Sequence, residues 1–252
     1  MTTDDAVKLI RGPQGTTVTL TVMRPSEKDA AKKIFNVTVT RAAVNIPSVS
    51  SKVIIDGKKT LGYIQISIIG QDTETALEKE IIDLQKQHLD GIILDLRGNG
   101  GGFLDIGVQV ASHFIPTGKT VVTSRYRLSG DNQVYTATGS GEFVGMPTVV
   151  LVDGLTASAG EIIAAALSED DGAKIVGTQT FGKGSIQTVA PRGAGEAIKY
   201  TIGKWFTPNN ENVDTTGIKP DVVIPFDTGA YTKSAVDNQL QTAEAQAIKL
   251  MK

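Results

Sequence analysis

The sequence of 252 residues contains no cysteine and only two histidines, His88 and His113. The absence of cysteine excludes a thiol nucleophile, a disulfide and a thiolate metal site, and it leaves the redox compartment undetermined. His113 falls in the apolar helical stretch LDIGVQVASHFI, where a packed or surface histidine is expected. A catalytic triad built on histidine therefore has weak support.

The sequence also lacks a strong net charge and a long apolar run. Lys and Arg total 25 against 27 Asp and Glu, so no overall field attracts the chain to nucleic acid or to anionic lipid. No apolar run approaches the ~20 residues that span a bilayer. Residues 1–10 carry two aspartates where a signal peptide has a basic start and an apolar stretch. We expect no nucleic-acid partner and no membrane-spanning segment.

The hydrophobic pattern predicts a mixed α/β fold. Hydrophobic residues make up 40% of the chain, which suits a globular protein with a sizeable core. Segments of period two and period 3.6 alternate along the chain, as in an α/β or mixed domain. The near-continuous apolar segments 91–96 and 148–154 predict buried strands, the first of them in the middle of a sheet. Residues 3–11 predict a short helix, and residues 16–24 and 35–41 predict two strands.

A strand-to-helix turn places Ser158 at the start of an alanine-rich helix, in VDGLTASAGEIIAAALSED. In one interpretation Ser158 and Glu161 form a capping box, which satisfies free backbone donors. On the local sequence alone this interpretation is favoured. In the other, the turn presents the serine as an exposed nucleophile beside backbone N–H groups and the positive helix end, which can stabilise an oxyanion.

The segment GTQTFGKGSIQ places Lys183 between Gly182 and Gly184. Lysine serves as a general base where desolvation favours its neutral form, and flanking glycines allow the backbone to pack closely around it. If the segment continues as a strand, Gln187 lies on the same face as Lys183 and can orient it. The alternative is that Lys183 lies on an ordinary solvent-exposed turn and has no catalytic role.

A phosphate-binding loop is a further interpretation of the same segment, because residues 177–183 match G-x-x-x-x-G-K. That signature continues with a hydroxyl residue and a helix. Here Gly184 follows the lysine, and SIQTVAP predicts an extended segment that stops at a proline. The phosphate interpretation is therefore disfavoured.

A glycine-rich turn, DLRGNGGGF at residues 95–103, follows the first buried strand. Its glycines do not keep the G-x-G-x-x-G spacing of a dinucleotide fingerprint. By itself such a run predicts only a flexible turn. Its unobstructed backbone N–H groups, close to the carboxyl end of a strand, nevertheless suit an oxyanion hole.

Together these segments resemble the carboxyl-terminal processing peptidases, or tail-specific proteases, a serine peptidase family with a Ser-Lys dyad. The resemblance covers about residues 44–245, in family order, through LGYIQIS, GIILDLRGNGGGFL, VDGLTASAGEI, VGTQTFGKGSIQ, TTGIKPDVVI and DNQLQTA. It implies that Ser158 is the nucleophile, that Lys183 is the general base and that Gln187 positions the lysine. No metal or organic cofactor is implied.

The resemblance also implies how the rest of the site is built. The oxyanion hole would use the N–H of Ala159 and that of a glycine in the NGGG turn, with Gly101 preferred over Gly102. Gly160 replaces the second serine of the family's usual TASASE, which we expect to loosen the helix start without altering the chemistry. The implied fold is a central sheet with flanking helices, like the ClpP and crotonase cores.

Three parts are expected along the chain: the last helix and strands of a PDZ domain at 1–43, a peptidase core at 44–230 and a carboxyl-terminal helix at 231–252. Because the earlier PDZ strands are missing, we expect a truncated chain whose first part binds no peptide tail by itself. The resemblance implies an extracytoplasmic protein, in the periplasm or at the cell surface, although these residues contain no signal peptide.

The expected function is a serine endopeptidase that cleaves near protein carboxyl termini. Its partner would be a peptide or protein substrate bound as an added strand, and a homo-oligomer is left open. The alternative is a catalytically silent peptide-binding or scaffold module with the same fold. A phosphate-loop NTPase is a remote third possibility.

Overall fold

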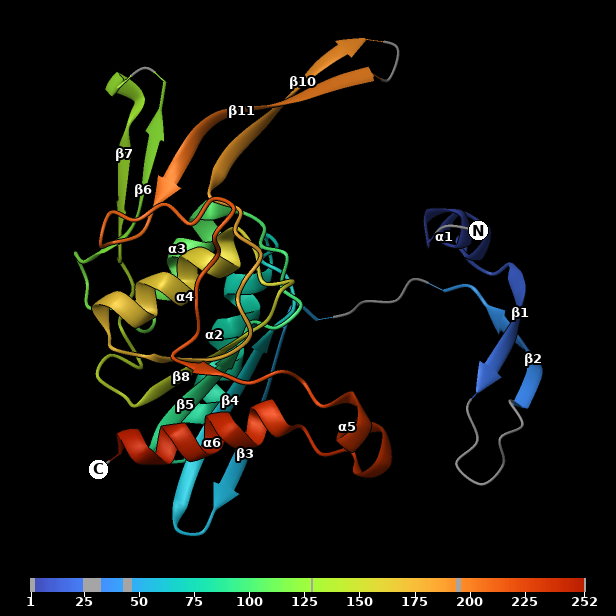
Figure 1. The fold of residues 1–252 in the computed structure, drawn as a ribbon, viewed down its shortest axis with the longest axis horizontal. Coiled ribbons are helices and arrows are strands. Elements are labelled where there is room, and N and C mark those ends of the chain that lie inside the picture. Colours follow the sequence, from blue (N-terminus) through green and yellow to red (C-terminus); the bar gives the residue numbers. More distant parts are fainter. Residues whose placement is uncertain (1–2, 25–32, 43–46, 128, 194–195, 252) are drawn as a thin grey trace. The chain divides into compact units, whose positions relative to one another are not determined.

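The computed structural model forms two compact units, Met1–Ile46 and Pro47–Lys252 (Figure 1). It describes residues 3–24, 33–42, 47–127, 129–193 and 196–251. Among the helices of these described ranges, none combines the length and apolar character needed to cross a membrane.

The first unit consists of one helix and one strand pair. Helix α1 (Thr3–Ile10) is followed by β1 (Thr17–Arg24) and β2 (Lys33–Thr40), which pair in antiparallel register. The expected helix and two strands are confirmed. The Arg41 side chain joins them by donating to the carbonyls of Ile10 and Thr17, at 2.7 and 2.9 Å. The PDZ assignment of this unit remains a prediction.

The second unit is built on a six-stranded sheet with the order β12-β9-β8-β5-β4-β3. Strands β4, β5, β8, β9 and β12 are parallel, and β3 is an antiparallel edge. Strand β5, predicted as central, lies between β8 and β4 with every residue buried. The bounds are β3 (Val49–Asp56), β4 (Lys59–Ile66), β5 (Gly91–Asp95), β8 (Thr148–Val152), β9 (Lys174–Gly177) and β12 (Val222–Val223).

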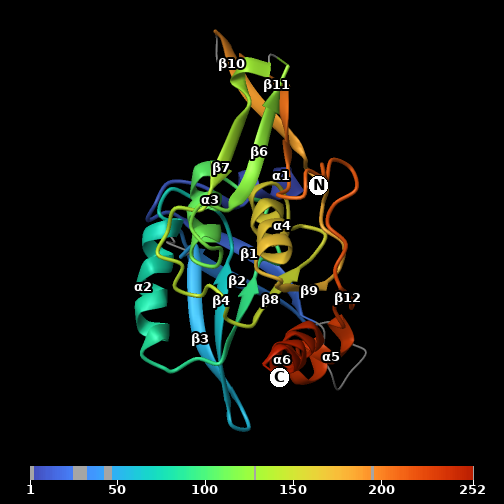
Figure 2. The ribbon, with the colours of Figure 1, turned by 90° about the vertical axis from the view of Figure 1, so that its left-hand side faces the viewer.

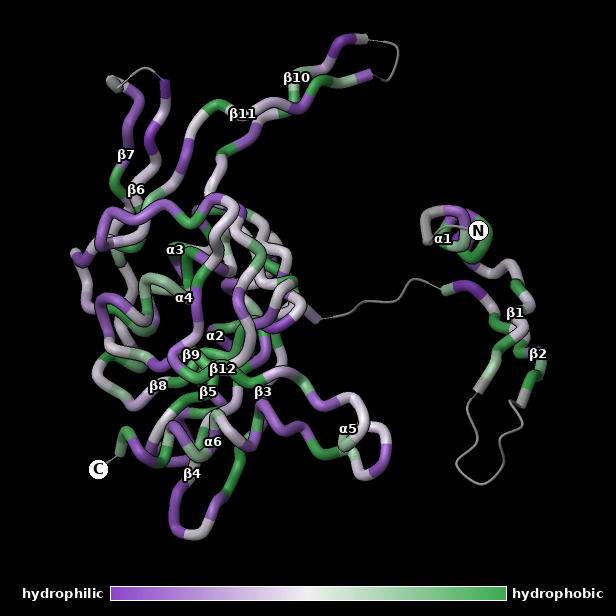
Figure 3. Tube along the Cα trace, viewed as in Figure 1, coloured by the Kyte–Doolittle hydropathy of each residue, from purple (hydrophilic) through white to green (hydrophobic). Residues whose placement is uncertain are grey.

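Helices cover both faces of this sheet (Figures 1 and 2). One face packs against α2 (Thr73–Gln85), α3 (Leu104–Ser112) and α4 (Ala159–Asp170), and the other against α6 (Asn238–Leu250), which follows α5 (Thr228–Ser234). Successive strand residues point to opposite faces. Leu94 accordingly joins the core beneath α3 and α4, whereas its neighbour Ile93 packs against α6. Figure 3 shows the hydrophobic residues gathered along these strands.

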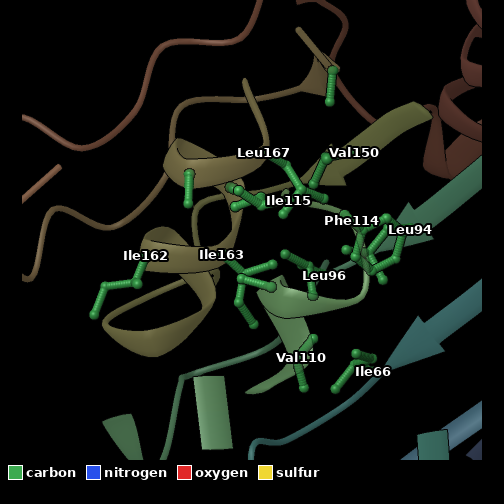
Figure 4. Close-up of a cluster of buried hydrophobic side chains, with 14 of the residues drawn as sticks. Ile66, Leu94, Leu96, Val110, Phe114, Ile115, Val150, Ile162, Ile163 and Leu167 are labelled. Atoms are coloured by element: carbon green, nitrogen blue, oxygen red, sulfur yellow. The ribbon is translucent and has the colours of Figure 1, made fainter. Parts of the chain in front are cut away.

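The larger core supports the start of α4. Figure 4 shows the α4 side chains Ile163 and Leu167 among Leu96 and neighbouring buried residues, whereas Ile162 points to the other side of the helix. Burying a side chain of this size contributes about 1.5–3 kcal/mol. The turn that precedes α4 is therefore attached to a rigid part of the molecule.

A second sheet of four antiparallel strands has the order β10-β11-β6-β7 and carries two long hairpins. Its members are β6 (Thr120–Tyr126), β7 (Gln133–Thr136), β10 (Ser185–Gly193) and β11 (Glu196–Phe206), with the short 3₁₀ helix η1 (Ser129–Asp131) between β6 and β7. The expectation that residue 191 stops the strand is wrong, because β10 continues through Pro191 to Gly193. Proline is tolerated there because β10 is an edge strand.

Candidate active site

Ser158 occupies the N-cap position of α4 in a strained backbone conformation. Its φ and ψ are 54° and −119°, whereas N-cap residues ordinarily adopt the β region. Such a conformation costs about 1–3 kcal/mol in a residue other than glycine. The turn is held by two backbone hydrogen bonds, from Ala157 to Asn99 at 2.9 Å and from Gly160 to Ala157 at 3.0 Å. A helix cap alone does not require this strain, which suits a presented nucleophile.

Glu161 connects the Ser158 turn to the lysine segment. Its carboxylate is fully buried and accepts the Ser158 N–H at 2.9 Å, as a capping box requires. It also accepts the Thr180 hydroxyl at 2.5 Å and the backbone N–H groups of Gly182 and Lys183 at 2.7 and 2.9 Å. The sequence indicated only the local capping interaction. The contacts with residues 180–183 could not be found from spacing.

The Lys183 segment lies between β9 and β10 and packs tightly against neighbouring backbone. A Cβ at Gly182, which has φ +85°, would approach Gly217 N to 2.8 Å, and one at Gly184 would approach Asp214 N to 2.6 Å. Both positions therefore require glycine. The Lys183 carbonyl accepts the Trp205 indole N–H at 2.8 Å. Because β10 follows instead of a helix, the phosphate-loop interpretation is wrong.

One pocket of about 350 Å³ brings the candidate side chains together. Ser158, Lys183 and Gln187 all line it, Ser158 and Lys183 half-buried and Gln187 exposed. The full lining is Gly102, Phe103, Leu104, Ser158, Ala159, Ile162, Lys183, Ser185, Ile186, Gln187, Lys199 and Trp205. Among the described hydrogen bonds, none joins the three candidate side chains to one another. A larger pocket of about 540 Å³ contains none of these three residues.

The two glycines considered for the oxyanion hole differ in their surroundings. The Gly101 N–H donates to Asn99 Oδ1 at 2.8 Å, and Gly101 does not line the pocket. Gly102 lines it, and no hydrogen bond of the described residues uses its N–H. Ala159 is the first residue of α4, so its N–H has no acceptor within the helix. The geometry favours Gly102 over Gly101 as the partner of Ala159.

Gly160 lies beside these donors in a closely packed position. It is buried, and a Cβ there would lie 3.3 Å from both Asn99 O and Thr156 Cγ2. The neighbours would have to shift to accommodate a serine. The expected loosening of the helix start by glycine remains a prediction.

A model of peptidase family S41 matches residues 60–224, which is more than half of the chain. The chain belongs to peptidase family S41. The carboxyl-terminal-processing protease of Picosynechococcus sp. is 35% identical over 240 residues, covering 94% of this chain and 56% of the relative. The carboxy-terminal processing protease CtpA of Bacillus subtilis is 36% identical over 222 residues, covering 88% and 46%. The chain thus spans about half the length of these curated relatives.

Solved structures agree with the family. The photosystem II D1 C-terminal processing protease aligns with a TM-score of 0.66 at 29% identity, covering 88% of this chain and 58% of that one. An S41 protease structure from Bacteroides fragilis, with a TM-score of 0.72 at 21% identity and coverage of 94% and 67%, supports the fold alone. The mixed α/β fold and the family resemblance are both confirmed.

In this S41 chain a buried ionic network holds the start of the glycine-rich turn. Arg97 donates to both carboxylate oxygens of Asp95, at 2.6 and 3.0 Å, and to Asp237 and Gln239 of the α6 region at 3.1 and 3.0 Å. Asp95 also accepts the Tyr63 hydroxyl at 2.7 Å. Burial and the Asp95 charge raise the pKa of Tyr63, so it stays a donor. The turn and α6 are thereby fixed to each other.

His113 lies outside the candidate pocket. It is 5% exposed at the end of α3 and does not line the pocket. Its Nδ1 lies 2.7 Å from a Glu142 oxygen, and its Nε2 lies 2.9 Å from a Glu74 oxygen. The interpretation as a packed histidine is confirmed, and its partners come from segments distant in the sequence.

His113 leads to a prediction on the pH dependence of stability. Burial lowers the pKa of His113, but hydrogen bonds and charge from Glu74 and Glu142 raise it more, so the folded-state pKa lies above the ordinary value. The contribution to stability is full below the ordinary pKa of ~6.5 and is lost as pH rises through the higher folded value. We expect the free energy of unfolding to fall less between pH 6 and 9 in His113→Gln than in the wild type. Urea unfolding measures this, and equal falls would contradict it.

Proposed function

We propose that this chain contains the catalytic part of a serine endopeptidase that cleaves peptide bonds near protein carboxyl termini. The observation that carries the proposal is that Ser158, in a strained helix-start turn, shares one pocket with Lys183 and with Gly102 and Ala159, whose N–H groups have no acceptor among the described residues. The names of the similar relatives, which describe carboxyl-terminal processing, support the choice of substrate. Family membership supports an extracytoplasmic location.

The proposed mechanism is acyl transfer by a Ser-Lys dyad. Neutral Lys183 takes the proton of Ser158 Oγ, which attacks the peptide carbonyl, and the lysinium then protonates the leaving amine. Water, deprotonated by the same lysine, releases the acyl group as a carboxylic acid. Proton transfer needs about 2.6–3.2 Å between the two atoms, and catalytic hydrogen bonds of free enzymes often tighten only when substrate binds. Rotation of the Lys183 side chain within the pocket would form the contact.

Two further groups assist this chemistry in the proposal. The N–H groups of Ala159 and Gly102 stabilise the oxyanion of the tetrahedral intermediate, a role in which one donor contributes about 10²–10³-fold. Gln187, at a register irregularity of β10, lines the pocket beside Lys183 and orients its amine. No metal or organic cofactor enters any step.

The substrate is proposed to bind along β10. This strand begins two residues after Lys183 and lies at the edge of its sheet, with β11 as its partner in the described structure. An extended peptide can add to such an edge through main-chain hydrogen bonds. Its scissile carbonyl would then approach Ser158 at the start of the strand.

The test is covalent labelling combined with peptide turnover. A fluorophosphonate is expected to label the wild type at Ser158 and to leave Ser158→Ala unlabelled, because the activated hydroxyl is the attacking group. Unfolded peptides should be cleaved by the wild type alone. A folded wild type that binds peptide but is neither labelled nor active would instead support the scaffold alternative. Mass spectrometry locates the label and the cleaved bonds.

A further inference from the structure

The pocket that contains Ser158 has an uncompensated positive charge. Its lining includes Lys183 and Lys199 but no aspartate or glutamate. Lys199 is exposed on β11, and its ammonium makes none of the side-chain hydrogen bonds or ion pairs found among the described residues. Lys204 on the same strand differs, because it pairs with Asp214 at 3.3 Å. The Lys199 ammonium is therefore available to a ligand.

The strand register places Lys199 on the pocket side of the hairpin. Lys199 lies opposite Val189 of β10, and Thr201 lies opposite Gln187. Residues directly opposite each other, and residues two apart on one strand, share a face of a sheet. Lys199 therefore faces the same side as Gln187, farther along β10 from Lys183. In a peptide paired with the β10 edge, the residue that lies level with Lys199 would be several positions away from the scissile bond.

The remaining lining residues indicate what this ammonium can bind. Phe103, Leu104, Ile162, Ile186 and Trp205 provide an apolar wall. Such a wall lowers the local dielectric and strengthens a charge pair once a bound peptide excludes water. The site thus combines apolar contact with attraction for a single negative charge, which suits a peptide carboxylate beside an apolar residue.

We propose that Lys199 is a specificity residue that binds a carboxylate of the peptide substrate, an inference that rests on the proposed peptidase function of this pocket. The carboxylate belongs either to the free end of a short tail or to an acidic side chain. A carboxyl terminus and an acidic side chain present the same chemical group, so the two sources are distinguished by the position of the negative charge along the peptide. The contact between Lys199 and the carboxylate is the same in the bound substrate and in the transition state, so it lowers KM and leaves kcat unchanged.

The experiment compares peptides of one sequence that end as a free acid or as an amide, with two to six residues after the cleaved bond. At the best tail length the free acid is expected to have a KM about 10-fold lower, with a similar kcat, as for a hydrogen bond to a charged group. An amide with one aspartate placed along the peptide tests the side-chain source. Lys199→Gln should raise the KM of the free acid to that of the amide and so remove the preference, and Lys199→Arg should keep part of it.

The matched control is Lys86→Gln, which removes one charge at the end of α2, outside the pocket lining. It should keep the wild-type preference. Equal KM values for acid, amide and aspartate peptides, or a preference that survives Lys199→Gln, would overturn the inference. Calorimetry of the same peptides with Ser158→Ala measures their affinities without turnover, and so tests carboxylate binding by Lys199 independently of catalysis. An enzyme that cleaves nothing yet binds acids through Lys199 would refute only the proposed function.

Discussion

Replacing Lys183 by arginine is expected to reduce peptide cleavage by at least about 10³-fold, although the positive charge is kept. A general base must offer a lone pair, and arginine stays protonated at any working pH. General-base catalysis contributes about 10²–10⁴-fold, and removal of a nucleophile costs still more. Lys183→Ala and Ser158→Ala should therefore be at least as inactive. The measurement is kcat/KM on an unfolded peptide.

Folding must be separated from chemistry in this series. Thermal unfolding should show each variant folded at the assay temperature, and His113→Gln should keep nearly full activity there because His113 lies outside the pocket. An active Lys183→Arg enzyme would exclude lysine as the base. A well-folded but inactive His113→Gln would point to histidine chemistry instead.

Glu161→Gln is expected to damage both stability and activity. Oε1 accepts from Thr180 and Gly182, and Oε2 accepts from Ser158 and Lys183. Glutamine keeps only one of these oxygens, so its amide N–H₂ faces two donors in either orientation. We expect the free energy of unfolding to fall by about 2–5 kcal/mol. We expect kcat to fall by about 10²-fold, because small displacements of reacting groups have effects of that size.

Urea unfolding and steady-state kinetics measure these two effects. Glu78→Gln, the same change on the exposed surface of α2, is the control and should alter neither. If Glu161→Gln were as stable and as active as the wild type, the carboxylate would not hold the turn and the lysine segment together.

The elements predicted most reliably from the sequence were those with a strong local pattern. The two-sided apolar character of residues 91–95 required a central strand, and the structure has one. Pro191 was misleading, because its effect depends on whether its strand lies at an edge, which the sequence does not show. The local hydrophobic pattern determines whether a strand forms, whereas the position of that strand in the sheet determines how far it extends.

Some features of the candidate site could likewise be predicted from the sequence, and others depend on the fold. Motif order and family resemblance identified Ser158 and Lys183, which the structure places in one pocket. The hydrogen bonds that connect Glu161 to the lysine segment could not be predicted, because these three donors lie some twenty positions away in the sequence. The choice between Gly101 and Gly102 depends on the rotation of single peptide groups, which a run of glycines leaves undetermined.

The edge of β10, which pairs with no strand of the described residues other than β11, also affects how the protein behaves when it is concentrated. An unpaired strand edge is a template for other chains, so it carries a risk of aggregation. Strand β10 has two irregularities in its register, at 186–187 and 191–193, and it contains Pro191. Irregular register and proline both interrupt continuous pairing. The strand can thus accept a short extended segment while resisting the growth of a sheet from one molecule to the next.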